Sequence, residues 1–232
     1  KLAGEEVLRS SGLAWTLLRP SLVYGDGSYG GTSLLRGMAG LPCLVPLPGR
    51  GDQAFTPIHA LDLARLVRLA CEDDRFAGQK LEPVGPATLD LKSLLTRYRT
   101  WLGFGPARFV AVPLPAMHVL ARVGDIVREG PIATNSLVQL LAGNAGDSAA
   151  FAAAAGFQPR ALDMALHERS AQVQDRWHAR LFFLAPAIRA MLVLLWLISA
   201  LLGLFAGQVR TEEVLMGLGW PLALALPLRL AS

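Results

Sequence analysis

A long apolar run near the carboxyl end constrains this chain more than any other feature. No charged residue occurs between Ala190 and Val209, where leucine, isoleucine, valine and phenylalanine dominate. At about 1.5 Å of rise per residue, a helix of this length crosses the roughly 30 Å hydrocarbon core of a bilayer. The alternative is a buried core helix of a large soluble protein. We expect a transmembrane helix, because the apolar character continues upstream through Leu181 to Ile188.

A second apolar segment, Val214 to Leu228, contains Pro221 and Pro227 and predicts either a second span or a re-entrant piece. Arginines flank the first span unevenly, and Lys and Arg are enriched on the cytoplasmic side of a span. The arginines that precede it are Arg169, Arg176, Arg180 and Arg189. Only Arg210 follows closely. We therefore expect the protein in the cell inner membrane, with the preceding domain facing the cytoplasm.

Composition separates a globular part from an apolar part. The 232 residues are 17% charged, whereas about a quarter is usual for a soluble domain. Because the deficit lies in 181–232, we expect one α/β domain over 1–175 and a membrane domain over 176–232. The net charge of +4 is not concentrated in a Lys/Arg cluster with aromatic residues, which argues against a nucleic-acid partner.

Helical and extended patterns alternate within residues 1–175, as in an α/β domain. A helix is expected up to Ser11, ending at Gly12, and a buried strand from Ala14 to Leu18 that stops before Pro20. Leu41 to Asp52 is rich in proline and glycine and is expected to be loop. The remaining expected helices are 32–39, 62–70, 89–102 with Thr88 as N-cap, and much of 116–167. Short extended segments are expected at 55–59 and 80–84.

The segment from Gly25 to Gly30 spells G-x-G-x-x-G. A pyrophosphate-binding loop needs a strand that runs directly into the tight turn and then a helix. Pro20 ends the predicted strand too early, and no acidic residue is well placed about twenty residues later. We therefore interpret this segment as a flexible glycine loop rather than a pyrophosphate site.

Four histidines share no metal-ligand spacing, so no metal site is expected; they are His59, His118, His167 and His178. His59 has the most informative place, in a proline-bounded stretch just before a helix, because ligands bind in loops beyond strand ends of α/β sheets. A structural histidine that bonds the backbone is the favoured alternative. Hydrolase chemistry has no support, since no nucleophile elbow, Cys/His pair or carboxylate cluster is found.

The first residues carry a family resemblance. The string K-x-x-G-E-E-x-L-R-S-S-G-L-x-W-T-L-L-R-P-S-L-V-Y-G, which ends at Gly25, resembles the segment after the catalytic tyrosine of extended and atypical short-chain dehydrogenases/reductases. This NAD(P)-binding, epimerase/dehydratase-like group includes an accessory subunit of respiratory complex I. Phe55 to Ala64 is similar to the family's segment with His-x-x-Asp-x-Ala, and Gly78 to Pro86 to its late strand. The apolar tail resembles the DoxX-like membrane domain fused to some members.

The resemblance implies the C-terminal part of a Rossmann-like domain followed by transmembrane helices, in a chain truncated at both ends. NAD(P)(H) would be bound mainly by a preceding half. Lys1 would be the lysine of a Tyr-x-x-x-Lys pair, which bonds the nicotinamide ribose and lowers the tyrosine's pKa. An exposed lysine on a helix end is the alternative for Lys1.

The resemblance also assigns the remaining candidate site residues. Pro20, Ser21 and Val23 would lie against the nicotinamide, and Tyr24 and His59 would contact substrate. The implied function is a membrane-anchored NAD(P)-dependent oxidoreductase or epimerase, with the lipid bilayer and a small, lipid-like substrate as partners. The alternative is a non-catalytic NAD(P)H-binding protein with a structural or assembly role at the membrane. A third interpretation is a membrane protein whose domain only binds a partner.

Overall fold

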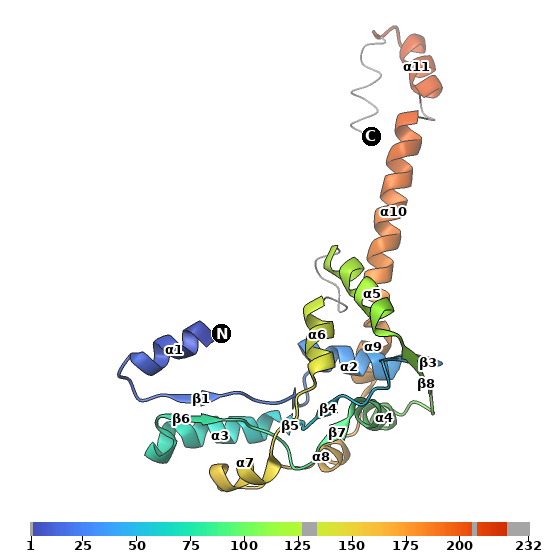
Figure 1. Ribbon diagram of the computed structural model, residues 1–232. Coiled ribbons are helices and arrows are strands. Elements are labelled where there is room, and N and C mark those ends of the chain that lie inside the picture. Colours follow the sequence, from blue (N-terminus) through green and yellow to red (C-terminus); the bar gives the residue numbers. More distant parts are fainter. Residues whose placement is uncertain (1, 127–133, 206–207, 222–232) are drawn as a thin grey trace. The chain divides into compact units, whose positions relative to one another are not determined.

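The computed structural model describes residues 2–126, 134–205 and 208–221 (Figure 1). The chain divides into two compact units, Lys1–Phe182 and Phe183–Ser232, each described by itself. The helices described in the first unit are α1 (Leu2–Ser10), α2 (Gly30–Gly40), α3 (Ala60–Glu72), α4 (Leu91–Trp101), α5 (Leu114–Ile126), α6 (Thr134–Ala142), α7 (Ser148–Ala155), α8 (Leu162–Glu168) and α9 (Val173–Leu181), with a 3-10 turn η1 (Asp74–Phe76). Its strands are β1 (Thr16–Leu18), β2 (Val23–Tyr24), β3 (Leu44–Pro48), β4 (Ala54–Phe55), β5 (Ile58–His59), β6 (Gln79–Leu81), β7 (Leu89–Asp90) and β8 (Arg108–Val112).

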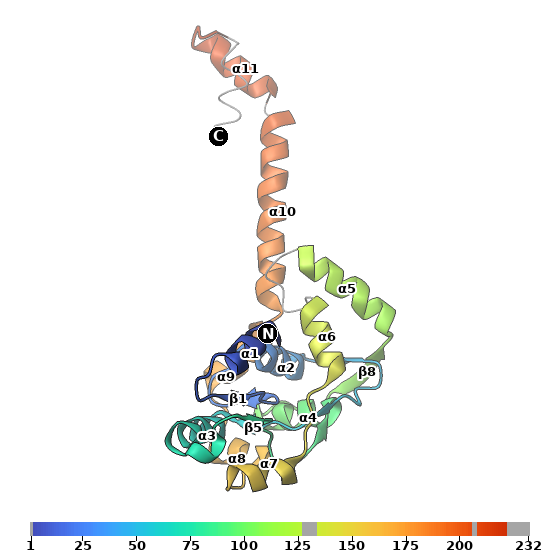
Figure 2. The same ribbon diagram turned by 60° about the vertical axis from the view of Figure 1, so that its left-hand side comes forward.

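Parallel pairing dominates the described strands. β1 pairs with β6, β2 with β5 and β3 with β8, all in parallel, while β4 and β7 are antiparallel. Parallel partners require a crossover connection, and helices supply it here: α2 and β3 lie between β2 and the later strands. In both views α9 lies beside α2, against which it packs (Figures 1 and 2). This arrangement confirms the expected α/β class.

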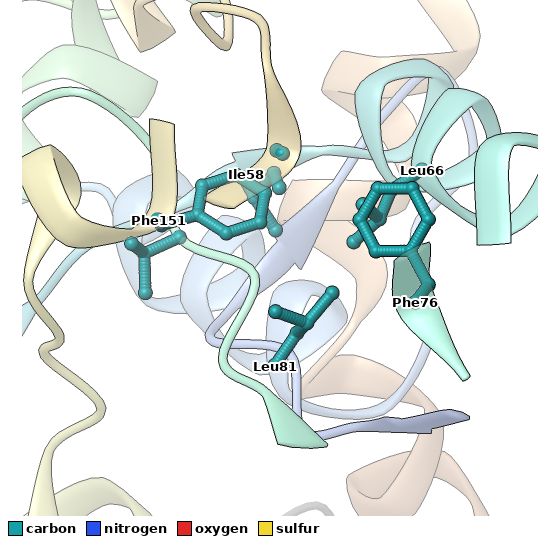
Figure 3. Close-up of a cluster of buried hydrophobic side chains, with 7 residues drawn as sticks. Ile58, Leu66, Phe76, Leu81 and Phe151 are labelled. Atoms are coloured by element: carbon teal, nitrogen blue, oxygen red, sulfur yellow. The ribbon is translucent and has the colours of Figure 1, made fainter. Parts of the chain in front are cut away.

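A buried apolar cluster holds one side of the first unit together (Figure 3). Its members come from β5, α3, η1, β6, the chain just after β6, and α7: Ile58, Leu66, Phe76, Leu81, Val84, Phe151 and Ala155. Burying one large apolar side chain stabilises a fold by about 1.5–3 kcal/mol. Because Ile58 belongs to this cluster and is fully buried, the core fixes the strand that carries His59.

The expected loop at Leu41–Asp52 is wrong, because β3 (Leu44–Pro48) lies inside it. Proline cannot donate to a strand ladder and is tolerated where the N–H position needs no partner. Among the described strands, β3 pairs with β8 alone. Pro46 and Pro48 are two positions apart, so both nitrogens face the same side of the strand, which can be the unpaired one.

The expected N-cap of the helix at 89–102 is also wrong. α4 begins at Leu91, and the Asp90 carboxylate caps it by accepting from Ser93 N at 2.6 Å. The Thr88 hydroxyl instead lies 3.1 Å from that of Thr56. Aspartate is a stronger N-cap than threonine, which explains the shift.

The second unit contains α10 (Leu184–Phe205) and α11 (Gln208–Gly217). Across the part of the chain that the structure describes, no helix is long and apolar enough to cross a membrane. The transmembrane helices expected at 190–209 and 214–228 are therefore not supported. Residues 206–207 and 222–228 of those two segments lie outside the described residues.

Candidate functional site

Two short parallel strands bring the predicted site residues together. Tyr24 pairs with His59 in the register of β2 and β5, and Ile58 N donates to Leu22 O at 2.9 Å. Tyr24 and His59 are each the last residue of their strand. Ligands of open α/β sheets bind beyond the carboxyl ends of parallel strands. The end of the β2–β5 pair is therefore the candidate site.

His59 begins α3 as its N-cap residue. Its Nδ1 accepts a hydrogen bond from Leu61 N at 3.2 Å, so the neutral ring carries its proton on Nε2. The side chain is buried, and burial followed by the nearby Arg160 guanidinium lowers the pKa of His59. These contacts confirm the interpretation of His59 as a histidine that bonds the backbone, and they leave Nε2–H as its remaining donor.

The Tyr24 ring packs edge-on against His59, with ring centroids 5.1 Å apart and an interplanar angle of 81°. Only 3% of Tyr24 is exposed, and its hydroxyl has no hydrogen-bond partner among the described residues. Burial raises the pKa of Tyr24, so the phenol stays protonated and remains a donor. The structure thus places Tyr24 in the interior behind His59.

The connection from β1 to β2, together with the first residue of β2, contains the predicted cofactor contacts. Ser21 is buried: its N–H donates to Pro83 O at 2.9 Å and its hydroxyl to Asn144 O at 2.6 Å. Pro20 is exposed and Val23 is half-buried. Ser21 therefore fixes the backbone, while Pro20 and Val23 present apolar surface. Lys1 lies outside the described residues, so its predicted catalytic role stays a prediction.

A buried carboxylate beneath His59 has a partner that the sequence did not reveal. Asp62, 6% exposed, accepts from Arg160 N at 2.9 Å and from Arg160 Nε at 3.2 Å. This pair ties the first turn of α3 to the connection before α8. The motif at 59–64 drew attention to Asp62, but no local signal indicates Arg160. Within the described residues, no group of three or more His, Cys, Asp or Glu could hold a metal ion.

The glycine loop follows β2 directly, since β2 ends at Tyr24 and α2 begins at Gly30. The sequence argument that no strand reaches this loop is therefore wrong; a second short strand forms after Pro20. The Tyr29 amide is occupied by the Thr32 hydroxyl at 3.1 Å, and Asp26 places a carboxylate within the loop. The occupied Tyr29 amide disfavours a cradle of backbone amides around a pyrophosphate.

Comparison with solved structures finds epimerases among the similar proteins. A nucleoside-diphosphate-sugar epimerase from Staphylococcus aureus matches with a TM-score of 0.51 and 20% identity, over 71% of this chain and 56% of that one. An epimerase from Methanothermobacter thermautotrophicus matches with a TM-score of 0.50 and 12% identity, over 79% and 48%. A UDP-glucuronic acid 4-epimerase from Bacillus cereus, solved with UDP-glucuronic acid and NAD, gives 0.48 and 16%, over 72% and 48%.

The chain thus spans about half the length of these structures. No protein-family model matches the chain, and no curated protein does. The comparisons give no support to the expected relation to complex I or to a DoxX-like domain. Because the sequence identities are only 12% and 20%, the two matches with TM-scores of 0.50 and 0.51 show a similar fold and nothing more. The matched part of the chain has the α/β fold of these two epimerases.

Proposed function

We propose that this chain is part of an NAD(P)-dependent oxidoreductase or epimerase of the short-chain dehydrogenase/reductase superfamily. One observation carries the proposal. Two segments that each resemble this superfamily, Lys1 to Gly25 and Phe55 to Ala64, are far apart in sequence. The parallel pairing of Tyr24 with His59 joins them at the carboxyl ends of their strands, where ligands bind.

Pro20 and Val23 offer apolar surface for a nicotinamide ring. Pro20 is exposed and Val23 half-buried, so both can pack against a flat, largely apolar group. Ser21 contributes through its backbone, because its hydroxyl is already bonded to Asn144 O. When bound, NAD(P)(H) supplies hydride transfer, and Lys1 would bond its ribose. The substrate would be a small, lipid-like molecule that lies next to the Nε2–H of His59.

Binding of the reduced cofactor tests this proposal. We expect the complete protein to bind NADH or NADPH, measured by the change in nicotinamide fluorescence on titration. The 232-residue chain alone should bind neither tightly, because the preceding half would supply most cofactor contacts. Tight binding by this chain alone would contradict that division. Binding by the complete protein without turnover of any substrate would favour a structural or assembly role.

We also propose that the protein acts at the inner membrane, through lipid contact of α10. Apolar side chains of α10 are exposed around its whole circumference, including Met191 at 70%, Trp196 at 74% and Leu202 at 59%. A helix that is apolar on all sides needs an apolar cover. Arg169, Arg176, Arg180 and Arg189 precede the apolar stretch, which supports a first unit on the cytoplasmic side.

A further inference from the structure

An arginine cluster beside the glycine loop has no role in the proposed hydride chemistry. It comprises two arginines, two aspartates and a tryptophan: Arg36, Arg169, Asp26, Asp175 and Trp101. Asp26 lies in the loop that directly follows Tyr24. The cluster therefore adjoins the end of the β2–β5 pair.

The buried half of the cluster is a carboxylate shared by two guanidinium groups. Asp175 contacts Arg36 Nη1 at 3.4 Å and Arg169 Nη2 at 3.2 Å. Asp175 also accepts from Gln172 N at 2.9 Å, which fixes it at the start of α9. Arg36 and Asp175 are only 3% and 6% exposed. One buried negative charge thus faces two positive charges.

Arg36 donates hydrogen bonds to the backbone of the glycine loop. Its Nη2 donates to Gly25 O at 2.6 Å, and its guanidinium carbon lies 4.8 Å from the centroid of the Trp101 ring. Its charge is therefore enclosed by Asp175, loop carbonyls and an aromatic face. Arg36 positions the loop, and it is too buried to meet a ligand from solvent.

Arg169 is held in place but is still accessible. Trp101 Nε1 donates to Arg169 O at 2.6 Å, and the Arg169 guanidinium carbon lies 5.8 Å from the Trp101 ring centroid. The side chain is 30% exposed. Its Nη1 is buried and has no hydrogen-bond partner among the described residues. Arg169 therefore combines a fixed position with a partly exposed guanidinium, whose Nε lies 3.5 Å from the exposed Asp26 carboxylate.

The remaining positive charge is balanced only by a weak contact. Asp26 Oδ1 lies 3.5 Å from Arg169 Nε, and the Asp26 side chain is 77% exposed. Exposed pairs of this kind contribute little stability, because water solvates both partners well. The other carboxylate near this junction, Glu168, pairs with Arg160 at 3.6 Å. The Asp26 carboxylate can therefore separate from Arg169 at a small cost in free energy.

We propose that Arg169 binds an anionic oxygen group of the ligand, phosphoryl or carboxylate, at the position that the Asp26 carboxylate occupies here. Arginine is suited to both groups, since its N–H donors form charge-assisted hydrogen bonds with their oxygens. Asp26 acts as an internal competitor that leaves when the ligand binds. The inference rests on the proposed function only in treating the glycine loop as part of the ligand site.

Calorimetric titration with inorganic pyrophosphate, and separately with malonate, tests this inference on the purified chain in detergent without dinucleotide. Ionic strength is held constant with NaCl, because exposed charge pairs are screened by salt. Asp26→Asn removes the competitor and should tighten binding about threefold. Arg169→Gln removes charge-assisted hydrogen bonds and should weaken binding at least about tenfold. The tighter of the two anions identifies the phosphoryl or carboxylate class.

Glu72→Gln is the matched control, because it breaks another exposed pair, Arg68–Glu72, and should leave anion affinity unchanged. Arg169→Lys, with circular dichroism to verify folding, replaces the glutamine variant if that variant unfolds; it should bind anions more weakly than the parent chain. Equal affinity of the parent and Asp26→Asn chains would overturn the inference, as would absence of anion binding in both. Loss of nicotinamide binding by the complete protein would concern the proposed function and not Arg169.

Discussion

A single arginine secures the end of α2 through backbone carbonyls. Arg99 is 6% exposed, and its guanidinium donates to four backbone carbonyls: Ala39 O, Leu41 O, Pro42 O and Gly105 O. Burial lowers the pKa of Arg99. The last carbonyls of a helix have no partner within the helix, so Arg99 meets a need that the α2 sequence itself leaves open.

Arg99→Met should therefore destabilise the fold strongly. Methionine fills much of the volume but leaves the carbonyls near the end of α2 unsatisfied, at a cost of about 2–4 kcal/mol in the free energy of unfolding. Urea unfolding followed by circular dichroism measures the loss. Arg97→Met, two residues away on the exposed face of α4, removes only the surface pair with Asp163 and should cost less than about 1 kcal/mol. Equal losses for the two variants would contradict this role of Arg99.

A glycine after β6 lies against the entry of β5, the strand that carries His59. A Cβ atom added to Gly85 would lie 1.9 Å from Pro57 O and 2.9 Å from Pro57 C. Gly85 N also donates to Thr56 O at 3.2 Å. Backbone, unlike a flexible side chain, cannot move aside cheaply. The close approach of the chain after β6 to the entry of β5 thus requires glycine at this position.

Gly85→Ala should push β5 away from its neighbours and lower the free energy of unfolding by about 2 kcal/mol or more. The affinities for anions and for the cofactor should also fall, because His59 lies at the end of that strand. Gly4→Ala is the control, since a Cβ there has nothing within 4 Å and alanine favours helix α1. Thermal unfolding of both variants measures the difference. A Gly85→Ala protein as stable as the parent would show that the chain after β6 can move away from the entry of β5 without loss of stability.

Local patterns predicted some elements of this fold and missed others for physical reasons. The helix at 60–72 follows from its apolar spacing, and the extended segment expected at 55–59 forms two short strands, β4 and β5, on either side of Pro57. β3 escaped prediction because a strand with one partner tolerates proline. His59 was found from its motif, whereas Arg160 bonds Asp62 from 98 residues away. Ser21 meets Asn144 across 123 residues, and no local period encodes such distant partners.

The molecule as a whole consists of two units with opposite surfaces. The first unit buries an apolar cluster around Ile58 and Leu66 (Figure 3). In the second unit, the α10 side chains from Met191 to Ile198 are all more than a third exposed. Apolar surface on this scale favours a nonaqueous neighbour. The proposed contact of α10 with lipid follows from this exposed apolar surface and can be tested directly.

We expect the purified chain to float with liposomes of phosphatidylethanolamine and phosphatidylglycerol in a density gradient. The double variant Leu194→Asp and Leu197→Asp should stay at the bottom, because each aspartate near the centre of a lipid-embedded helix costs about 2.5–3.5 kcal/mol. Val7→Asp, at a 70% exposed apolar position in the first unit, is the matched control and should float like the parent. In sealed right-side-out vesicles from cells, added protease should spare a first unit that faces the cytoplasm. Flotation of the double variant would show that α10 is not the lipid contact, since the two charges would then lie away from the bilayer.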